Sequence, residues 1–261
     1  MPQKKNQHYV PQFHIRNWSN NKKTVSQWNK ASSRFFDDIA NVKNIASKSY
    51  MYGKDGEIED LFTKVENIIA AVYSRLLNDE HFNNITSLEF EGLYLYFSLC
   101  NVRTLESAES KERQLLELMK VQLKMQQAHG QKLEIPKDIF DKVKIDNAVN
   151  SPILAAIQKY TVLLDLDFVL IKNTSEVEFI TSDYPLIHYN LLTVKKGLWS
   201  GYDMASAGAM FILPISPRYA ILLYDSIAYS ISNLQNSLVK IKQKGQIDEI
   251  NKLKKTISVE L

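Results

Sequence analysis

The chain has 261 residues, of which 45% are hydrophobic and 23% are charged, a composition typical of a globular protein with a sizeable core. The net charge of +3 neither indicates nor excludes a nucleic-acid partner, because such proteins gather basic charge on one face. The single cysteine, Cys100, excludes an intrachain disulfide framework and favours a reducing compartment. No apolar run approaches the roughly 20 residues of a membrane span. We therefore expect a cytoplasmic protein.

The first part of the chain predicts a short helix, a strand and one long helix. Residues 8–18 read HYVPQFHIRNW, and Pro11 suits the first turn of a short helix because its missing N–H would be unpaired there anyway. Residues 24–31 predict a strand, and residues 31–56 a loop. A helix is expected at 57–78, where apolar residues recur every three or four positions and acidic residues crowd the first turns.

The middle of the chain predicts two more helices and then two strands. The second helix begins near Thr86 or Ser87, with Ser87 as a suitable N-cap, and is expected to continue to about residue 127. The third helix is expected at 146–164. Strands follow at 167–173 and 176–183, where β-branched and aromatic residues are frequent.

The last part of the chain predicts two apolar strands on either side of a turn between Pro214 and Pro217. Residues 233–255 predict a polar helix, and residues 256–261 a closing strand. A helical first half followed by a strand-rich second half is an α+β pattern. We expect the helices to pack on a mixed or antiparallel sheet built mainly from the second half, with the N-terminal segment docked on that sheet. The whole chain, 1–261, is expected to form a single domain, with a possible subdivision into 1–145 and 146–261.

The common catalytic signatures are absent from the sequence. It contains no GxxxxGK[ST], GxGxxG, HExxH or GxSxG motif and no CxxC pair. These absences exclude the usual P-loop ATPases, dinucleotide enzymes, zincins, α/β-hydrolases and zinc fingers.

The opening segment carries the first group of candidate site residues. Gln12 and Arg16 are four residues apart and would share one face of the short helix, with His8 just before its positive end. Such a group suits an anion such as phosphate. The alternative is that Arg16 pairs with a structural carboxylate and that His8 is a packing residue. His14 has no comparable context, and we expect it at the surface.

A second group lies in the FITSDYP segment, residues 179–185. It is interpreted as a buried strand that ends in a turn, a place where Asp183 would be fixed by the strand and exposed by the loop, as catalytic carboxylates often are. The alternative is that Ser182 and Asp183 only cap the turn through hydrogen bonds from their side chains to the backbone.

Arg103 lies near the end of the mostly apolar part of the second helix. A buried arginine needs a partner, because an unpaired buried charge is costly. Asp183, Glu59 or Glu66 would supply it. Glu59 and Glu66 are seven residues apart on the first long helix and therefore lie on one side of it, although helical acids are more often simply solvated.

Three segments together, HYVPQFHIRNW, FITSDYP and PISP, resemble an uncharacterised, mainly bacterial family known as domain-of-unknown-function family 4238. Its members open with HYVPQF-x-L-R-N-F and later show FITSDNP followed by PLSP. The resemblance spans about residue 7 to 220 and supplies no activity. The chain departs from the pattern at Tyr184, Trp18 and Ile215, and only Tyr184 bears on function, because the usual asparagine would contribute an amide. The matching positions are His8, Tyr9, Pro11, Phe13, Arg16, Ser182, Asp183, Pro185, Pro214 and Pro217, with Arg103 as a further match.

The first functional hypothesis is an enzyme that acts on a phosphate-bearing substrate, a nuclease in a bacterial defence or mobile-element setting. His8 would be the general base or a metal ligand, Asp183 and Glu66 the carboxylates, and Arg16 and Arg103 the phosphate clamps. Histidine and carboxylates are the usual ligands of a divalent cation that activates water, which would be the cofactor. The predicted site therefore comprises His8, Asp183 and Glu66 as catalytic groups and Tyr9, Gln12, Arg16, Arg103 and Ser182 as substrate-binding groups.

The second hypothesis is a non-catalytic module that recognises nucleic acid, a nucleotide or a partner protein. Gln12, Arg16 and Arg103 would then bind an anion, while Tyr9 and Tyr184 stack on a ring. A third hypothesis is that these side chains only lock the N-terminus to the sheet. The two functional hypotheses require the opening segment to meet the Ser-Asp turn and to form a single polar pocket with it.

Overall fold

The computed structural model describes residues 5–52, 57–104, 150–195 and 203–257. Among these residues the strands are β1 (Asn6–His8), β2 (Thr24–Asn29), β3 (Arg34–Asn41), β4 (Ser47–Ser49), β5 (Asp167–Asn173), β6 (Ile187–Tyr189), β7 (Met210–Pro214), β8 (Tyr219–Tyr224) and β9 (Leu238–Ile241). The helices are α1 (Gln12–Ile15), α2 (Glu57–Asp79), α3 (Ser87–Val102), α6 (Asn150–Lys159), α7 (Leu191–Lys195) and α8 (Lys244–Ile257), with 3-10 turns η1 (Arg16–Trp18) and η2 (Tyr160–Leu163).

A mixed five-stranded sheet is built entirely from the second half of the chain. Its strand order is β6-β7-β8-β5-β9, and neighbours are antiparallel except for β5 and β9, which are parallel. The sheet uses the strands predicted at 167–173 and on both sides of the Pro214–Pro217 turn. Together with the helices of the first half, it confirms the predicted α+β fold.

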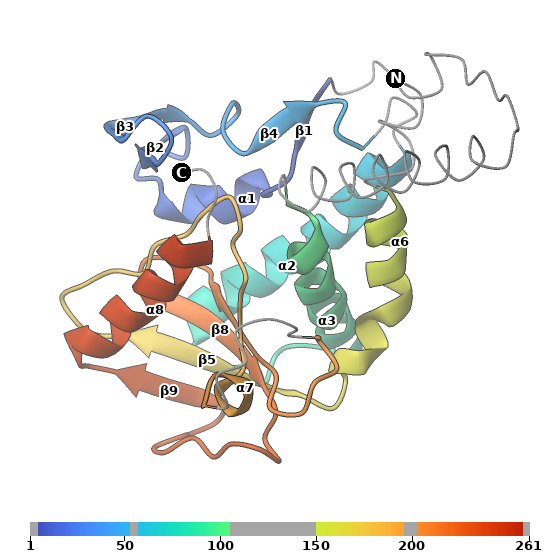
Figure 1. Ribbon diagram of the computed structural model, residues 1–261, viewed down its shortest axis with the longest axis vertical. Helices are drawn as coiled ribbons and strands as arrows, with labels where there is room; N and C mark the ends of the chain where they lie inside the picture. The colour runs from blue at the N-terminus through green and yellow to red at the C-terminus, as the bar shows by residue number, and fades with distance from the viewer. Residues whose placement is uncertain (1–4, 53–56, 105–149, 196–202, 258–261) are drawn as a thin grey trace, which may run out of the picture.

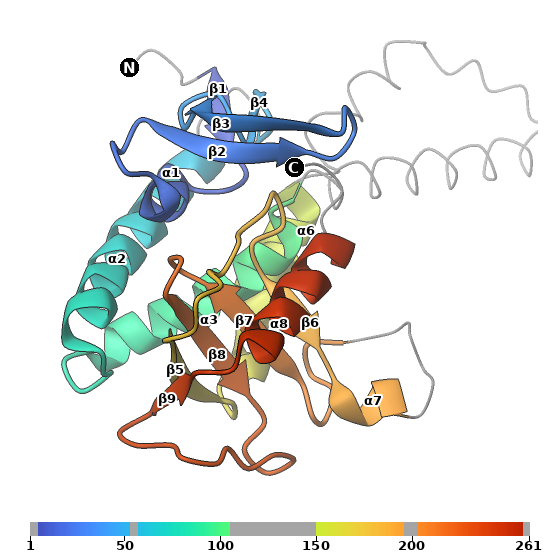
Figure 2. The same ribbon diagram turned by 90° about the vertical axis from the view of Figure 1, so that its left-hand side faces the viewer.

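The sheet is buried on both faces because its strands alternate apolar side chains between two cores. On β5, Phe168 and Leu170 join the larger core, which includes α2, α3 and α6. Val169 and Ile171 point the other way, into a smaller core that α8 covers with Ile247. Figures 1 and 2 show the long helices on one side of the sheet and α8 on the other, with the β2–β3 hairpin across one end of these layers.

The two long helices begin where the sequence predicts, but α3 ends earlier than predicted. α2 matches its prediction within one residue. α3 begins at Ser87, with Thr86 as its N-cap, and ends at Val102. The predicted continuation of this helix to residue 127 is therefore wrong, because the chain leaves the helix at Arg103. The residues beyond 104, and residues 146–149 of the third predicted helix, lie outside the described part of the chain.

The N-terminus of α3 is held by a capping box. The Thr86 hydroxyl accepts a hydrogen bond from the backbone N–H of Glu89 at 3.4 Å, and the Glu89 carboxylate accepts one from the backbone N–H of Thr86 at 2.9 Å. Thr86→Ala is expected to lower the free energy of unfolding by about 1 kcal/mol, measured by urea denaturation. Thr63→Ala, in the exposed interior of α2, is the control and is expected to cost nothing. Equal stability of wild type and Thr86→Ala would contradict the prediction.

The region predicted as a loop, 31–56, contains two strands. β3 pairs with β2 as an antiparallel hairpin, and β4 pairs with β1. The alternation of β3 is broken because the two steps from Val25 to Gln27 on β2 lie opposite four steps, from Ala40 to Phe36, on β3.

The predicted strand at 176–183 is not a strand. Residues 179–185 are called the corner segment here. Backbone groups of this segment form hydrogen bonds with other parts of the chain. Phe179 donates to the carbonyl of Pro217 at 2.9 Å and accepts from the Trp18 indole at 3.0 Å. Ile180 donates to the Asn251 side chain at 3.1 Å. Side chains from η1 and α8 thus take the place of a neighbouring strand.

The predicted helix at 233–255 is a strand followed by a shorter helix. β9 lies parallel to β5, with Val239 beside Ile171, and α8 begins only at Lys244. The prediction failed because the leucines and isoleucines keep a helical spacing through both β9 and α8. The sequence does not mark the turn between these two elements. Of the predicted closing strand, Thr256 and Ile257 belong to α8, and residues 258–261 are outside the described ranges. Within those ranges, no helix is long and apolar enough to cross a membrane.

Candidate functional site

The predicted site residues lie around two pockets on opposite sides of the opening segment. His8, at the end of β1, lines a small polar pocket, and its neighbour Tyr9 lines a larger one beside the hairpin. Successive side chains of an extended chain point to opposite sides, which explains the division. The single polar pocket expected from the sequence is therefore replaced by two.

The smaller pocket, called the arginine pocket here, has a volume of about 250 Å³. One face of α2 forms one wall, and the opening segment with α1 forms another. Of the predicted residues it brings together His8, Gln12, Arg16, Glu66 and Arg103. Asp183 and Ser182 line the other pocket, so the structure does not join them to this group.

Arg103 is buried, with 5% of its surface exposed, and its three guanidinium nitrogens are all engaged. It donates to the Tyr52 hydroxyl at 3.1 Å, to the Glu66 carboxylate at 2.5 Å and to the His8 carbonyl at 2.6 Å. Its guanidinium carbon also lies 3.8 Å from the centre of the Phe62 ring. Glu66 is thus the carboxylate partner that the sequence required. These contacts favour a structural role for Arg103 over the role of phosphate clamp.

Arg16 and Gln12 share a face of the opening helix, as predicted. Arg16 donates to the Gln12 side-chain oxygen at 2.6 Å, and both are partly exposed at the rim of the arginine pocket. His8 is half-buried, and this burial lowers its pKa, although a hydrogen bond to the backbone of Val42 opposes the shift. The lowered pKa favours a neutral imidazole, which suits a packing residue better than a cationic anion-binding group.

His14 was expected at the surface, and that prediction is wrong. The side chain is 0% exposed, and its Nε2 lies 2.8 Å from the Thr181 hydroxyl oxygen. Burial lowers the pKa of His14 to about 3, and the nearby Lys254 adds to this shift. The ring packs against Trp18, four residues later, at 5.1 Å between centroids. That four-residue spacing to an aromatic residue was the available signal. His14 thus links the opening helix to the corner segment.

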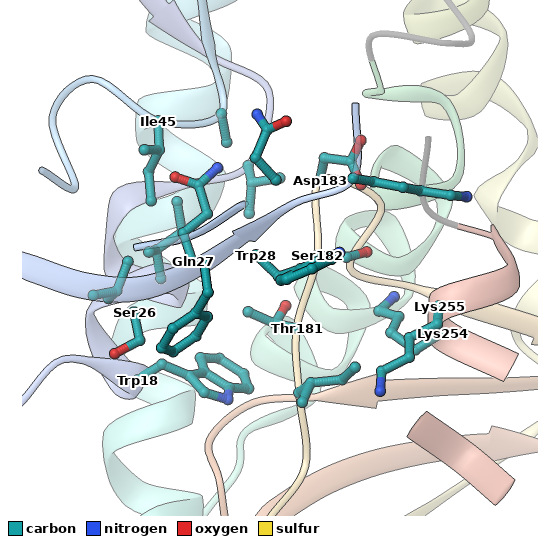
Figure 3. Close-up of a pocket in the computed structure, with 18 of the residues that line it drawn as sticks. Trp18, Ser26, Gln27, Trp28, Ile45, Thr181, Ser182, Asp183, Lys254 and Lys255 are labelled. Atoms are coloured by element: carbon teal, nitrogen blue, oxygen red, sulfur yellow. The ribbon is translucent and has the colours of Figure 1, made fainter. Parts of the chain in front are cut away.

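The larger pocket, called the hairpin pocket here, has a volume of about 700 Å³. Five parts of the chain line it: the opening segment, the β2–β3 hairpin, the turn at Ile45 and Ala46 before β4, the corner segment and the end of α8. Figure 3 shows Thr181, Ser182 and Asp183 in the middle of the view, with Trp18 on one side and Lys254 and Lys255 on the other. The pocket therefore combines aromatic side chains with a few polar and charged ones.

The hairpin contributes an exposed aromatic pair to this pocket. Trp28 on β2 lies directly opposite Phe35 on β3, and the two side chains are 51% and 60% exposed. Exposed large aromatics beside a cavity often mark a binding surface. Neither residue was a candidate from the sequence. The alternation around Trp28 predicted a strand, but Phe35 fell in the region interpreted as a loop.

The corner segment has a well-defined polar structure. The Ser182 hydroxyl donates to the Tyr184 carbonyl at 2.9 Å and accepts from the Tyr184 backbone N–H at 3.1 Å. The Tyr184 hydroxyl donates to the Asn101 side chain at 2.8 Å. Ser182 therefore performs the turn-capping role that was the alternative to a substrate contact. Asp183 is buried and lines the hairpin pocket.

Lys254 is a further pocket residue that was not a candidate from the sequence. It is 0% exposed, lines the hairpin pocket, and donates through Nζ to the backbone carbonyl of Tyr184. Burial lowers the pKa of its amine well below the usual value, and the charge of Asp183 opposes this shift. The spacing of Ile247, Asn251 and Lys254 places all three on the buried face of α8, and this was the signal available in the sequence.

The chain matches one known protein family. The family described as "Protein of unknown function (DUF4238)" covers residues 6–255. The chain belongs to this family. The match to DUF4238 confirms the resemblance found in the sequence and extends it through most of α8. No curated protein and no solved structure matches the chain. The DUF4238 description assigns no activity, so the function has to be argued from the pockets.

Proposed function

We propose that the hairpin pocket binds a nucleotide, with its base against the aromatic pair and its phosphate near the lysines at the rim. The observation that carries this proposal is the exposed pair of Trp28 and Phe35 beside a cavity of about 700 Å³. A cavity of this size falls within the usual range of roughly 300–1,000 Å³ for small-molecule sites.

The aromatic pair supports a planar ring as part of the ligand. Every nucleobase has a π-face, and stacking on an aromatic side chain is worth about 1–3 kcal/mol per base. Trp28 and Phe35 are held in register by the hairpin, so little freedom is lost when a base stacks on them. Trp18 adds a third aromatic wall, fixed by its hydrogen bond to Phe179.

The charges around the pocket support an anionic ligand. The described lining contains Lys30, Lys254 and Lys255 and one acidic residue, Asp183. Lys30 and Lys255 are exposed, so they supply positive potential where a ligand would enter. The sequence also led to the proposal of a phosphate-bearing ligand, with His8 and Arg16 as its contacts. We retain that class of ligand and propose the hairpin pocket as its binding site.

The nuclease hypothesis stays a prediction. In the ranges that the structure describes, no group of three or more His, Cys, Asp or Glu residues could hold a metal ion. His8 and Asp183 line different pockets, and Glu66 is paired with Arg103. These observations support binding as the function of the hairpin pocket.

The test is the affinity of the full chain for AMP, GMP, CMP and UMP, measured by calorimetry and by quenching of tryptophan fluorescence. Trp28→Ala is expected to weaken binding roughly 5- to 150-fold, which corresponds to the loss of one stacking contact. Phe35→Ala is expected to act in the same direction. Both variants should keep the wild-type unfolding midpoint, because the two rings are largely exposed.

Ile39→Ala is the matched control. Ile39 lies on the same hairpin and is 66% exposed, but it is not part of the pocket lining. Its variant is expected to bind nucleotides as the wild type does. The proposal is wrong if none of the four nucleotides binds, or if Trp28→Ala and Ile39→Ala bind with equal affinity.

A further inference from the structure

We propose that Lys254 is a reactive amine that condenses with a carbonyl group of a ligand held in the hairpin pocket and forms a Schiff base. This inference rests on the proposed function, because it needs the same pocket to admit a ring-bearing, anionic ligand. It adds two things to the binding site. The first is a substrate class, which is carbonyl compounds, and the second is a covalent step.

The first support is the position of Lys254. The side chain comes from the C-terminal part of α8 and reaches the pocket beside the corner segment. Figure 3 shows it on the same side of the corner segment as Lys255. Because Lys254 is 0% exposed, bulk water does not solvate its amine, whereas its neighbour Lys255 is exposed. A buried lysine in the wall of an aromatic cavity is the arrangement in which lysine acts as a nucleophile.

The second support is the set of groups that face the amine. The Tyr184 carbonyl accepts its hydrogen bond, and the Tyr184 ring lies 5.9 Å away. The titratable groups are His14 from α1, Cys100 from α3 and Asp183 from the corner segment. His14 and Cys100 are uncharged at neutral pH, because burial lowers the pKa of the imidazole to about 3 and raises that of the thiol to about 12. Asp183 is therefore the one anion in this set.

These surroundings favour the free amine. An ammonium group has three donors and is best satisfied by three acceptors or by water. Burial accordingly lowers the pKa of Lys254 far below the usual value, against the opposing charge of Asp183. An uncharged amine keeps the lone pair that attack on a carbonyl requires.

The proposed step is balanced without an oxidant or a cofactor. The Nζ lone pair attacks the carbonyl carbon, and the carbonyl π electrons move to oxygen. Two protons leave the nitrogen, one as the carbinolamine forms and one as the imine forms, and the oxygen takes up two protons and departs as water. The products are an imine and one water molecule. Asp183 lines the same pocket, and in this proposal its carboxylate would accept a proton from the nitrogen and return it to the departing oxygen.

Pyridoxal 5′-phosphate is the probe for this inference, because it combines an aldehyde, a planar ring and a phosphate. The full chain is treated with the probe at neutral pH, the imine is reduced with sodium borohydride, and the modified lysines are mapped by mass spectrometry. Lys254 is expected to be labelled at least about tenfold faster than Lys255, because each unit of lowered pKa raises the free-amine fraction about tenfold. The labelling rate of Lys254 should also rise less steeply with pH.

Two variants and the wild-type map separate the outcomes. Lys255→Arg is expected to keep the fast labelling, and Lys254→Met to abolish it. If Lys254→Met fails to fold, the wild-type map alone decides, since label on the exposed lysines with none on Lys254 would overturn the inference. Nucleotide binding without labelling of Lys254 would refute the amine and leave the proposed function standing. Labelling of Lys254 in a chain that binds no nucleotide would support the amine and refute the nucleotide.

Discussion

Arg103→Met is expected to lower the free energy of unfolding by about 3–5 kcal/mol, because it removes one partner of a buried ion pair. Methionine fills much of the same space and still packs on Phe62, so the loss isolates the charge and the hydrogen bonds. Glu66 would lose its cation, and the Tyr52 hydroxyl and the His8 carbonyl would each lose a donor. Equilibrium unfolding in urea at pH 7 measures the change.

Glu178→Gln is the control for this prediction. Glu178 forms an ion pair with Arg218 at 3.2 Å, but the two side chains are 58% and 43% exposed. Solvent screens such a pair, so its loss is expected to change the stability by no more than about 1 kcal/mol. If Arg103→Met were as stable as Glu178→Gln, the buried network around Arg103 would not be an important source of stability.

The second prediction concerns pH and His14. The buried imidazole has a pKa of about 3, whereas in the unfolded chain it has the model value of 6.5. Between these values the unfolded chain binds a proton that the folded chain does not bind, so the free energy of unfolding falls as the pH falls. The loss of stability that His14 causes is expected to reach about 2 kcal/mol at pH 5, relative to pH 8. The loss stops growing only below about pH 3.

His14→Gln tests this contribution, because glutamine keeps a hydrogen-bonding group near Thr181 but does not titrate. Its stability should depend less steeply on pH between 6.5 and 5 than that of the wild type. The remaining slope will include His8 and His188, whose pKa values are also lowered by burial. Thr63→Ala, in the exposed interior of α2, does not change a titratable group and is the control, so it should keep the full slope. Identical slopes in His14→Gln and wild type would show that His14 is not held neutral in the fold.

The elements that the sequence predicts well are those whose own pattern decides their structure. β5 and α2 carry continuous apolar or periodic stretches, and the structure places them within one residue of the prediction. The corner segment has a similar strand-like pattern, but the strand predicted there is not formed. Its backbone partners are the side chains of Trp18 and Asn251, which lie far away in sequence, and no local pattern reports them.

The prediction of site residues has the same limit, because contacts between residues far apart in sequence leave no local pattern. The partner of Arg103 could be narrowed to a few carboxylates, because the need for a counter-charge follows from burial alone. The separation of His8 from Asp183 could not be predicted, because it depends on which side of one extended segment each residue faces. His14 was expected at the surface and Lys254 was not singled out, but both are buried among groups from other elements.

The dependence of the corner segment on α8 has a consequence for how the protein is made. Asn251 accepts from Ile180 and Lys254 donates to Tyr184, so two of the contacts that shape this segment come from the last described helix, and Asn251 also donates to Glu178 just before the segment. Domains begin to fold from the N-terminal side while they are translated. The helices and most strands can associate on the ribosome, but the wall carrying Asp183 takes its final form only after α8 has emerged. A nascent chain stalled before α8 is therefore expected to hold a sheet without a finished ligand site.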